Sequence, residues 1–271
     1  MTEPRVLVEI DGPIATVTLD RPDKLNGVDL ETIEELIAAA ESLRSDRDIR
    51  AIVLRGNGRS FCAGLDFGAV FGGGSVRDKT RIARSFFAGP RAVNRFQRVT
   101  QIWRELPVPV IAVVHGHCYG AGVQLAAGAD FRFTTPDASW SILEAKWGLV
   151  PDMAGTVPFS ELMSADDVMR LAMTGETITG TRAVELGLAT EVSDDPHAAA
   201  LALIDQIVER SPDAVAATKR LVYATRRGSE RRSYRVERRL QSAMFKARNT
   251  VIARTAGLAR QKPQFGPRTF R

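Results

Sequence analysis

The sequence is poor in the residues that build disulfide frameworks and zinc sites. Its 271 residues include two cysteines and three histidines, too few for either kind of site. Cys62 and Cys118 each fall in a glycine-containing turn, where we expect small buried residues. The sequence also has no run near the roughly 20 apolar residues that a helix needs to cross a bilayer, and no basic start followed by an apolar stretch. We therefore expect no membrane segment and a cytoplasmic protein.

Acidic residues are outnumbered by basic ones, and the formal net charge is +5. Glu230 and Glu237 stand at helical spacing within a stretch that carries much of the surplus, formed by Arg226, Arg227, Arg231, Arg232, Arg235, Arg238 and Arg239. A solvated helix face or a subunit contact explains such interleaved charges. Aromatic residues that could stack on bases are sparse there, so nucleic acid is not the expected partner. A small molecule that bears phosphates is also attracted to a basic surface.

Apolar patterning predicts an α/β core followed by a helical C-terminal region. Strands are predicted at 6–10 and 14–19 as a hairpin, and at 50–55, 110–114 and 187–192. Helices are predicted after Asp29, from about 77 to 105, and at 165–173, 180–187, 197–210, 213–226 and 229–257. Because no strand follows 196, we expect a catalytic core over 1–196 and a helical oligomerisation region over 197–271.

The most informative stretch runs from Val110 to Asp152. It begins with a β-branched strand and continues through a glycine-rich turn into residues that favour helix. Such a turn leaves free N–H groups that can hold a developing negative charge. A second turn, Ala63-Gly64, follows the strand at 50–55. Either turn alone is explained as an ordinary connection, but together they can place two N–H groups around one oxygen, which is the geometry of an oxyanion hole.

Two acids, Glu144 and Asp152, lie in an otherwise apolar stretch. Carboxylates in such surroundings are either satisfied structural groups or working acids and bases. Upstream, the segment between Asp66 and Glu105 contains Gly72-Gly-Gly74 and then an apolar stripe formed by Ile82, Phe86, Val93, Phe96, Val99 and Ile102. We interpret this stripe as core, although an acyl pocket would have its wall here.

Several motifs together resemble the crotonase (enoyl-CoA hydratase/isomerase) superfamily over nearly the whole chain. They are Leu19-Asp-Arg-Pro-Asp-Lys-Leu-Asn26, Ser60-Phe-Cys-Ala-Gly-Leu-Asp66, Pro109 to Gly116 with Gly120-Ala-Gly122, Asp130-Phe-Arg, Glu144 with Gly148-Leu-Val-Pro151, and Ala183-Val-Glu-Leu-Gly-Leu188. The resemblance implies a spiral of repeated ββα units, a helical C-terminal region that builds trimers or hexamers made of two trimers, and an acyl-CoA substrate. It implies no cofactor, since coenzyme A is part of the substrate.

The resemblance also implies roles for individual residues. The oxyanion hole would be formed by the N–H groups of Leu65 and Ala121. The substrate would be contacted by five further residues, namely Ala63, Asp66, Gly120, Arg260 and Lys262. The last two fall near the C-terminal position from which relatives reach the phosphates of coenzyme A.

The acids decide which reaction the resemblance implies. Hydratases of the family hold water between two glutamates twenty residues apart, and those positions are Gln124 and Glu144 here. An amide cannot take up a proton as a carboxylate does. Asp152 stands where dienoyl-CoA isomerases carry an aspartate, although they normally have an aspartate at the position of Gln124 as well. The favoured interpretation is double-bond isomerisation in fatty acid metabolism, with Glu144 and Asp152 transferring protons and Gln124 as a neutral neighbour.

Other interpretations remain open. Glu144 could add water to a 2-enoyl-CoA while Gln124 holds that water, which would make the protein an enoyl-CoA hydratase. An RNA-binding homologue would suit the basic helices, and a catalytically lapsed homologue would suit Gln124.

Overall fold

The structure is a computed structural model, and it describes residues 3–66, 68–69, 80, 93–226 and 228–270. Most of the helix predicted to begin near 77 lies outside the described residues, and so do Gly72-Gly-Gly74, Ile82 and Phe86. The end of that helix is present as α4 (Arg95–Glu105), which Asn94 and Gln97 open with a capping box. Its residues Phe96, Val99 and Ile102 are buried, as the apolar stripe predicts.

Within the described part of the chain, one sheet carries the fold, with six strands in the order β1-β2-β3-β4-β6-β9. Their bounds are β1 (Val6–Asp11), β2 (Ile14–Leu19), β3 (Ala51–Gly56), β4 (Val110–Val114), β6 (Phe131–Thr134) and β9 (Glu191–Val192). The pair β1 and β2 is the predicted hairpin and is antiparallel, whereas the pairs from β2 to β9 are parallel. The carboxyl ends of parallel strands meet at one edge, where open α/β sheets bind ligands.

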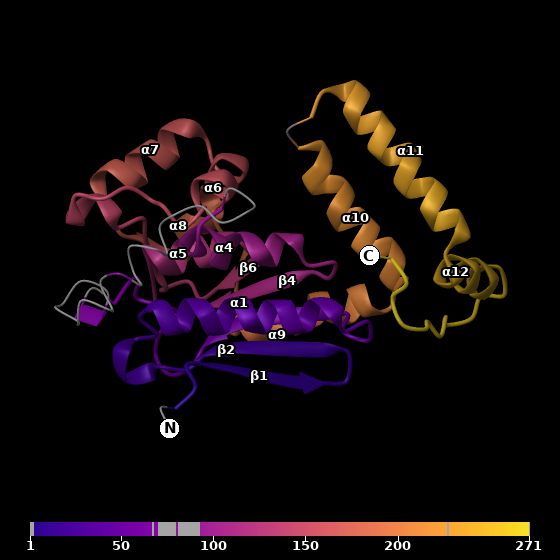
Figure 1. Cartoon of the computed structure of the whole chain (residues 1–271), viewed down its shortest axis with the longest axis horizontal. Coiled ribbons are helices and arrows are strands. Elements are labelled where there is room, and N and C mark those ends of the chain that lie inside the picture. The colour runs from indigo at the N-terminus through magenta and orange to yellow at the C-terminus, as the bar shows by residue number, and fades with distance from the viewer. Residues whose placement is uncertain (1–2, 67, 70–79, 81–92, 227, 271) are drawn as a thin grey trace.

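Both faces of this sheet are covered (Figure 1). On one face, α1 (Leu30–Ser45) and α4 bury Ile33, Leu36 and Trp103 in a large core. Helix α1 begins directly after Asp29, as predicted, and the side chain of Asp29 caps it by accepting the N–H of Thr32. On the other face, Ala200 and Ile204 of α9 (Pro196–Val208) pack against alternate residues of β3, β4 and β6. Helices on both faces require strands that are apolar throughout, and β4 is buried at every residue.

A smaller sheet and short helices complete the core beside the main sheet. The strands β5 (His117–Tyr119), β7 (Ser139–Ser141) and β8 (Ile178–Thr179) form a sheet in the order β5-β7-β8. The remaining elements of this part are η1 (Pro22–Lys24), α5 (Ala121–Ala127), η2 (Glu144–Trp147), α6 (Thr156–Leu162), α7 (Ala165–Thr174) and α8 (Gly180–Glu185). The strand predicted over 187–192 is thus limited to the two residues of β9.

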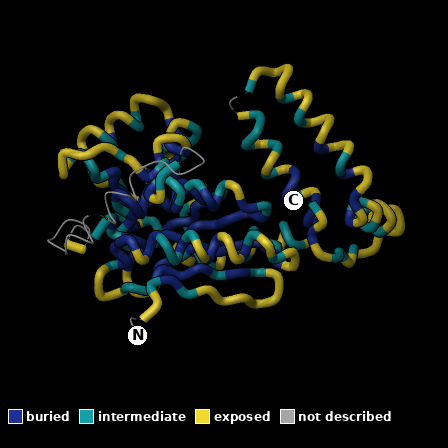
Figure 2. The backbone as a smooth tube through the Cα atoms, viewed as in Figure 1, coloured by how far each residue is buried: buried dark blue, intermediate teal, exposed yellow. Residues whose placement is uncertain are grey.

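The chain ends in a helical arm that projects from the core, formed by α10 (Pro212–Thr225), α11 (Glu230–Lys246) and α12 (Arg248–Leu258). Exposed residues cover much of its surface (Figure 2). The predicted single helix over 229–257 is wrong, because the chain is extended at Ala247, with ψ of 132°. The side-chain amide of Asn249, buried after this break, donates to Asp213 at 2.8 Å, a tertiary contact that holds α12 at an angle to α11.

One buried ion pair joins the arm to the core. Lys219 of α10 contacts Asp130 at 2.7 Å and also donates to the carbonyl groups of Trp103 and Val108. The hydroxyl of Tyr223 donates to the same carboxylate at 2.8 Å. The predicted boundary at 196/197 falls after the first residue of α9, a helix that packs on the sheet, whereas the projecting arm begins at α10. No helix among the described residues is long and apolar enough to span a membrane.

Candidate active site

The first predicted oxyanion donor, Leu65, is held by a short parallel bridge to Val28. The N–H of Val28 donates to the carbonyl of Gly64, and the N–H of Asp66 donates to the carbonyl of Val28, both at 2.8 Å. In an extended chain, successive peptide groups point to opposite sides. The carbonyl of Gly64 and the N–H of Asp66 both face Val28. The N–H of Leu65, which lies opposite the carbonyl of Gly64 in the same peptide group, therefore points away from Val28.

The second donor, Ala121, reaches the same place because two segments pair in register. Cys62 and Cys118 form a parallel bridge, in which the N–H of Cys62 donates to His117 and the N–H of Tyr119 donates to Cys62, both at 2.9 Å. Leu65 follows Cys62 by three residues (65 − 62), and Ala121 follows Cys118 by three (121 − 118). The bridge therefore brings both donors to corresponding points of two adjacent turns. Both cysteines are fully buried, as predicted.

Close approach of the two turns depends on glycine. A Cβ on Gly64, whose φ is +103°, would lie 3.1 Å from the carbonyl oxygen of Tyr119 and 4.0 Å from the nitrogen of Ala121. A Cβ on Gly122 would lie 2.5 Å from the carbonyl oxygen of Cys62. Ala121 is the first residue of α5, so its N–H has no acceptor within the helix. The N–H groups of Leu65 and Ala121 donate to no other described residue.

Gln124 lies one turn into α5 and is 1 % exposed. Its carbonyl oxygen accepts the backbone N–H groups of Met153 at 2.9 Å and Gly155 at 3.1 Å. Since backbone groups can only donate here, the amide nitrogen must face the other way, and it donates to Oε1 of Glu144 at 2.7 Å. A Cβ on Gly155 would lie 2.5 Å from Cγ of Gln124. The glycine thus permits the contact that orients the amide.

Glu144 presents its second carboxylate oxygen without a partner. Oε2 is buried and makes no hydrogen bond to the described residues, whereas Oε1 is held by Gln124. A Cβ on Gly120 would lie 3.4 Å from Oε1, so the carboxylate stands directly at the turn that carries Ala121. Burial raises the pKa of Glu144 and the charge of Asp152 raises it further, against the lowering effect of hydrogen bonds from backbone groups and from Gln124.

Asp152 stands at the mouth of the site and is exposed in the isolated chain. Neighbouring protein atoms still remove part of its hydration, and this desolvation raises its pKa above the usual value. Two neighbouring carboxyl groups with raised pKa values, of which Glu144 is raised in part by the charge of Asp152, meet one requirement for moving protons near neutral pH.

Most of the predicted site residues meet around one cavity of about 300 Å³. It is lined by seven of them, namely Ala63, Leu65, Gly120, Ala121, Gln124, Glu144 and Asp152. Its remaining wall is largely apolar and is formed by Gly64, Phe96, Leu143, Trp147, Leu149 and Met153. Trp147 and Leu149 are 57 % and 45 % exposed, so the cavity opens through an apolar mouth.

Three of the predicted substrate contacts lie outside the cavity. Asp66 pairs with Arg21 at 3.1 Å and accepts the N–H of Ala69. Lys262 pairs with Glu209 at 2.8 Å. Arg260 is exposed just beyond the end of α12. The structure therefore brings neither basic residue of the arm to the cavity of its own chain.

Sequence reasoning missed the residues that orient the site from behind. The backbone of Met153 and Gly155 fixes Gln124, and Val28 fixes Leu65. The glycine three residues after Asp152 was a visible signal, since an isolated glycine often marks a close approach of backbone to another group. Val28 acts through its backbone, and its residue type therefore gives no signal of this role.

Comparison with known proteins identifies relatives that match most or nearly all of the chain. A family model described as enoyl-CoA hydratase/isomerase matches residues 9–268. Carnitinyl-CoA dehydratase from Salmonella arizonae is 34% identical over 229 residues, which cover 83% of this chain and 82% of that protein. The peroxisomal Delta(3,5)-Delta(2,4)-dienoyl-CoA isomerase from Arabidopsis thaliana is 27% identical, over 94% of this chain and 93% of that protein. The solved enoyl-CoA hydratase from Mycobacterium tuberculosis H37Rv superimposes with a TM-score of 0.85 at 29% identity, over 97% of this chain and 99% of that one.

Proposed function

Since the chain belongs to the enoyl-CoA hydratase/isomerase family and has the crotonase fold, we propose that it shifts a double bond within an unsaturated acyl-CoA thioester in fatty acid metabolism. The thioester oxygen accepts the N–H groups of Leu65 and Ala121. Glu144 and Asp152 move protons to and from the acyl carbons, and Gln124 orients Glu144.

The single observation that carries this proposal is the pair of oxygens on Glu144. Gln124 holds Oε1 beside the glycine turn, and Oε2 is buried without a hydrogen bond to the described residues. A buried carboxylate oxygen without a hydrogen bond is costly, and such unsatisfied groups concentrate where a ligand completes the set. Substrate binding would supply the missing contact through a carbon-bound proton.

The chemistry follows from the charges. When a carboxylate removes a proton from the carbon next to the thioester carbonyl, the C–H electron pair moves onto the carbonyl oxygen and forms an enolate, which the two N–H groups stabilise. A carboxylic acid then delivers a proton to a carbon farther along the conjugated chain, and the double bond moves. We assign Glu144, beside the oxyanion turn, to the nearer carbon and Asp152, at the mouth, to the distal carbon.

Coenzyme A enters as part of the substrate, and the proposal requires no other cofactor. The arm of α10–α12 is the proposed oligomerisation region, and a homotrimer or a hexamer made of two trimers is the proposed assembly. Because Arg260 and Lys262 lie outside the cavity of their own chain, their proposed contact with the phosphates of coenzyme A would come from a neighbouring copy.

The alternative function is syn addition of water to a 2-enoyl-CoA, with Glu144 and Gln124 holding the water. The relatives that are named dehydratase and hydratase support it. Against it, the carbonyl oxygen of Gln124 already accepts two backbone N–H groups. Gln124 therefore has one amide N–H left with which to bind a water, and this group can donate a hydrogen bond but cannot accept a proton.

The test compares two substrates. We expect conversion of a 3,5-dienoyl-CoA to its 2,4 isomer to be faster than hydration of crotonyl-CoA. Glu144→Gln and Asp152→Asn should each lower isomerisation by about 10² to 10⁴, since each removes a proton carrier but keeps its shape. Faster hydration would favour the alternative, and undiminished activity in both variants would refute the assignment of the acids.

A further inference from the structure

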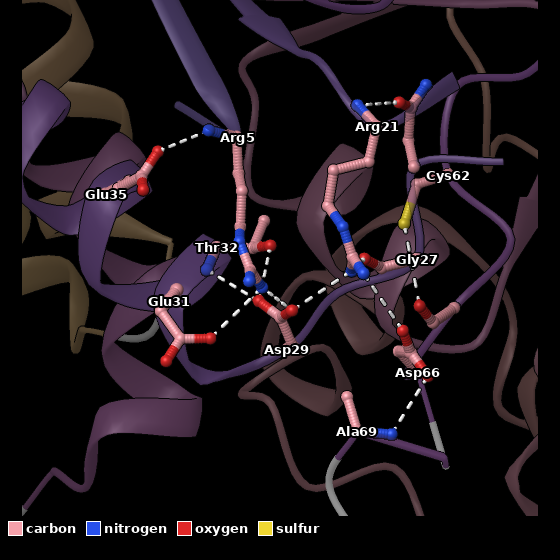
Figure 3. A network of polar contacts seen from close by, with 12 residues as sticks. Arg5, Arg21, Gly27, Asp29, Glu31, Thr32, Glu35, Cys62, Asp66 and Ala69 are labelled. Carbon is pink, nitrogen blue, oxygen red and sulfur yellow. Dashed lines mark hydrogen bonds and ion pairs between the residues drawn. The ribbon is translucent and has the colours of Figure 1, made fainter. Parts of the chain in front are cut away.

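Arg21 lies just before η1, outside the cavity, and its largely buried guanidinium joins three segments (Figure 3). Nη1 donates to the carbonyl of Gly27 at 2.5 Å and contacts Asp29 at 3.1 Å. Nη2 donates to Asp66 at 3.1 Å. Gly27 and Asp66 are the direct neighbours of Val28 and Leu65, the two residues of the bridge that orients the first oxyanion donor.

We propose that Arg21 is a positioning residue for the oxyanion hole. Its guanidinium clamps the bridge between Val28 and Leu65, and so fixes the direction of the Leu65 N–H. This inference rests on the proposed function, because it assumes that this N–H stabilises a developing enolate.

The clamp matters because the bridge is isolated. Val28 and Leu65 belong to no strand, so two backbone hydrogen bonds hold the pair and no ladder continues them. A planar guanidinium with several donors in a fixed plane can tie a carbonyl and a carboxylate at once, which an ammonium group cannot do in the same geometry.

The carboxylate side of the clamp stays charged. Burial acts to raise the pKa of Asp66, but the N–H of Ala69 and the guanidinium of Arg21 bind the carboxylate and hold its pKa below the usual value. The contact between Arg21 and Asp66 therefore remains an ion pair at neutral pH. On this proposal, the oxyanion hole is already formed when the substrate binds.

A matched control is present in the same cluster. Arg5 pairs with Asp29 and with Glu31 but touches neither Gly27 nor Asp66. Arg5→Met thus removes an arginine from the cluster and leaves the clamp in place, whereas Arg21→Met removes the clamp. Arg21→Lys keeps the positive charge but loses the planar group that binds the carbonyl of Gly27 and the carboxylate of Asp66 at the same time.

The experiment measures turnover and, independently, binding of an oxyanion. For Arg21→Met we expect kcat to fall about 10- to 100-fold while KM changes less than about threefold, because a displaced donor is lost mainly in the transition state. A 3-oxoacyl-CoA, whose enolate absorbs in the near ultraviolet, serves as the probe. Its apparent pKa when bound should rise by about one to two units in Arg21→Met, matching the loss in kcat. For Arg21→Lys, kcat and the pKa of the bound probe should lie between those of the wild type and of Arg21→Met. Arg5→Met should keep the wild-type kcat and the wild-type pKa of the bound probe.

Two results would overturn the inference: an unchanged pKa of the bound probe in both Arg21 variants, or an equal change in Arg5→Met, which would indicate general loss of structure. If Arg21→Met does not fold, Arg21→Lys decides in the same way. Glu144→Gln separates this inference from the proposed function, since it should lower isomerisation by about 10² to 10⁴ without changing the oxyanion hole. Full activity of Glu144→Gln would refute the proposed function, and the probe would still report on Arg21.

Discussion

Gln124→Glu tests the arrangement of the acids most directly. The introduced carboxyl would keep the two N–H groups of Met153 and Gly155 on one oxygen. Its other oxygen would replace the amide nitrogen that now lies 2.7 Å from Oε1 of Glu144. A donor would thus be exchanged for an acceptor, and two carboxyl groups would face each other inside the cavity.

The size of the effect follows from this distance. With charge centres about 4 Å apart and an effective dielectric constant near 20, two carboxylates repel by about 4 kcal/mol, which equals about three pKa units. One proton should therefore remain on the pair up to about pH 7, as in other carboxyl pairs that share a site. The pair as a whole, and neither acid alone, would show this raised apparent pKa.

The sign of the stability change depends on pH. A carboxyl whose pKa is raised in the folded state binds its proton more tightly there than in the unfolded chain. The free energy of unfolding of the variant should therefore match that of the wild type near pH 4. As the pH rises, the free energy of unfolding of the variant should fall below that of the wild type. At pH values above the folded-state pKa, the difference should level off at about 4 kcal/mol.

Urea denaturation of both proteins at several pH values measures this difference. Gln124→Met is the control, because it removes the hydrogen bonds without adding a charge. Since the amide of Gln124 lowers the pKa of Glu144, the loss of stability in this variant should also grow with pH, but by less than in Gln124→Glu. In activity assays, Gln124→Glu should isomerise more slowly and hydrate crotonyl-CoA faster, since two carboxyl groups can then hold a water. A loss of stability that does not depend on pH would refute the contact between Gln124 and Glu144.

Three further predictions concern separate parts of the molecule. The kcat/KM for isomerisation should fall as the pH drops through the raised pKa of Glu144, because the base must be ionised, and a pH–rate profile should place this limb above the usual glutamate value of 4.5. Gly155→Ala should displace Gln124, with a destabilisation of about 1 to 3 kcal/mol in urea denaturation and a marked loss of kcat. Lys219→Met should destabilise the protein by about 3 to 5 kcal/mol, because it removes the cation that balances the largely buried charge of Asp130, which keeps only hydrogen bonds such as that from Tyr223. Adding Asp130→Asn should restore part of that loss, and kcat per folded molecule should not change in either case.

Local signals in the sequence predicted the strands that lead into the two turns, and the resemblance to the crotonase superfamily selected most of the residues that meet in one cavity. The two glycine turns, each after a buried strand, indicated a pair of backbone N–H donors, and the resemblance to the crotonase superfamily assigned these donors to Leu65 and Ala121. The apolar setting of Glu144 and Asp152 marked them as unusual carboxyl groups. Such patterns are readable because each depends on residues that are neighbours in the chain.

Features set by distant contacts were not readable in the same way. The direction of the Gln124 amide depends on the backbone N–H groups of a distant segment. Every non-proline residue has such a group, so residue type does not reveal the contact. The break between α11 and α12 contains neither glycine nor proline and depends on the contact of Asn249 with Asp213. The position of Lys262 depends on how the arm leaves the core, and nothing in the local sequence determines that path.

The register of Cys62 with Cys118 has a consequence for how this chain can change over evolution. The two N–H donors belong to the backbone, so the hole is specified by the number of residues after each cysteine more than by the side chains at Leu65 and Ala121. Substitutions at those two positions should be tolerated wherever the new side chain fits, whereas an insertion or deletion of one residue in either turn would turn a donor away. Length in these turns, rather than residue identity, should therefore be the property under the stronger selection.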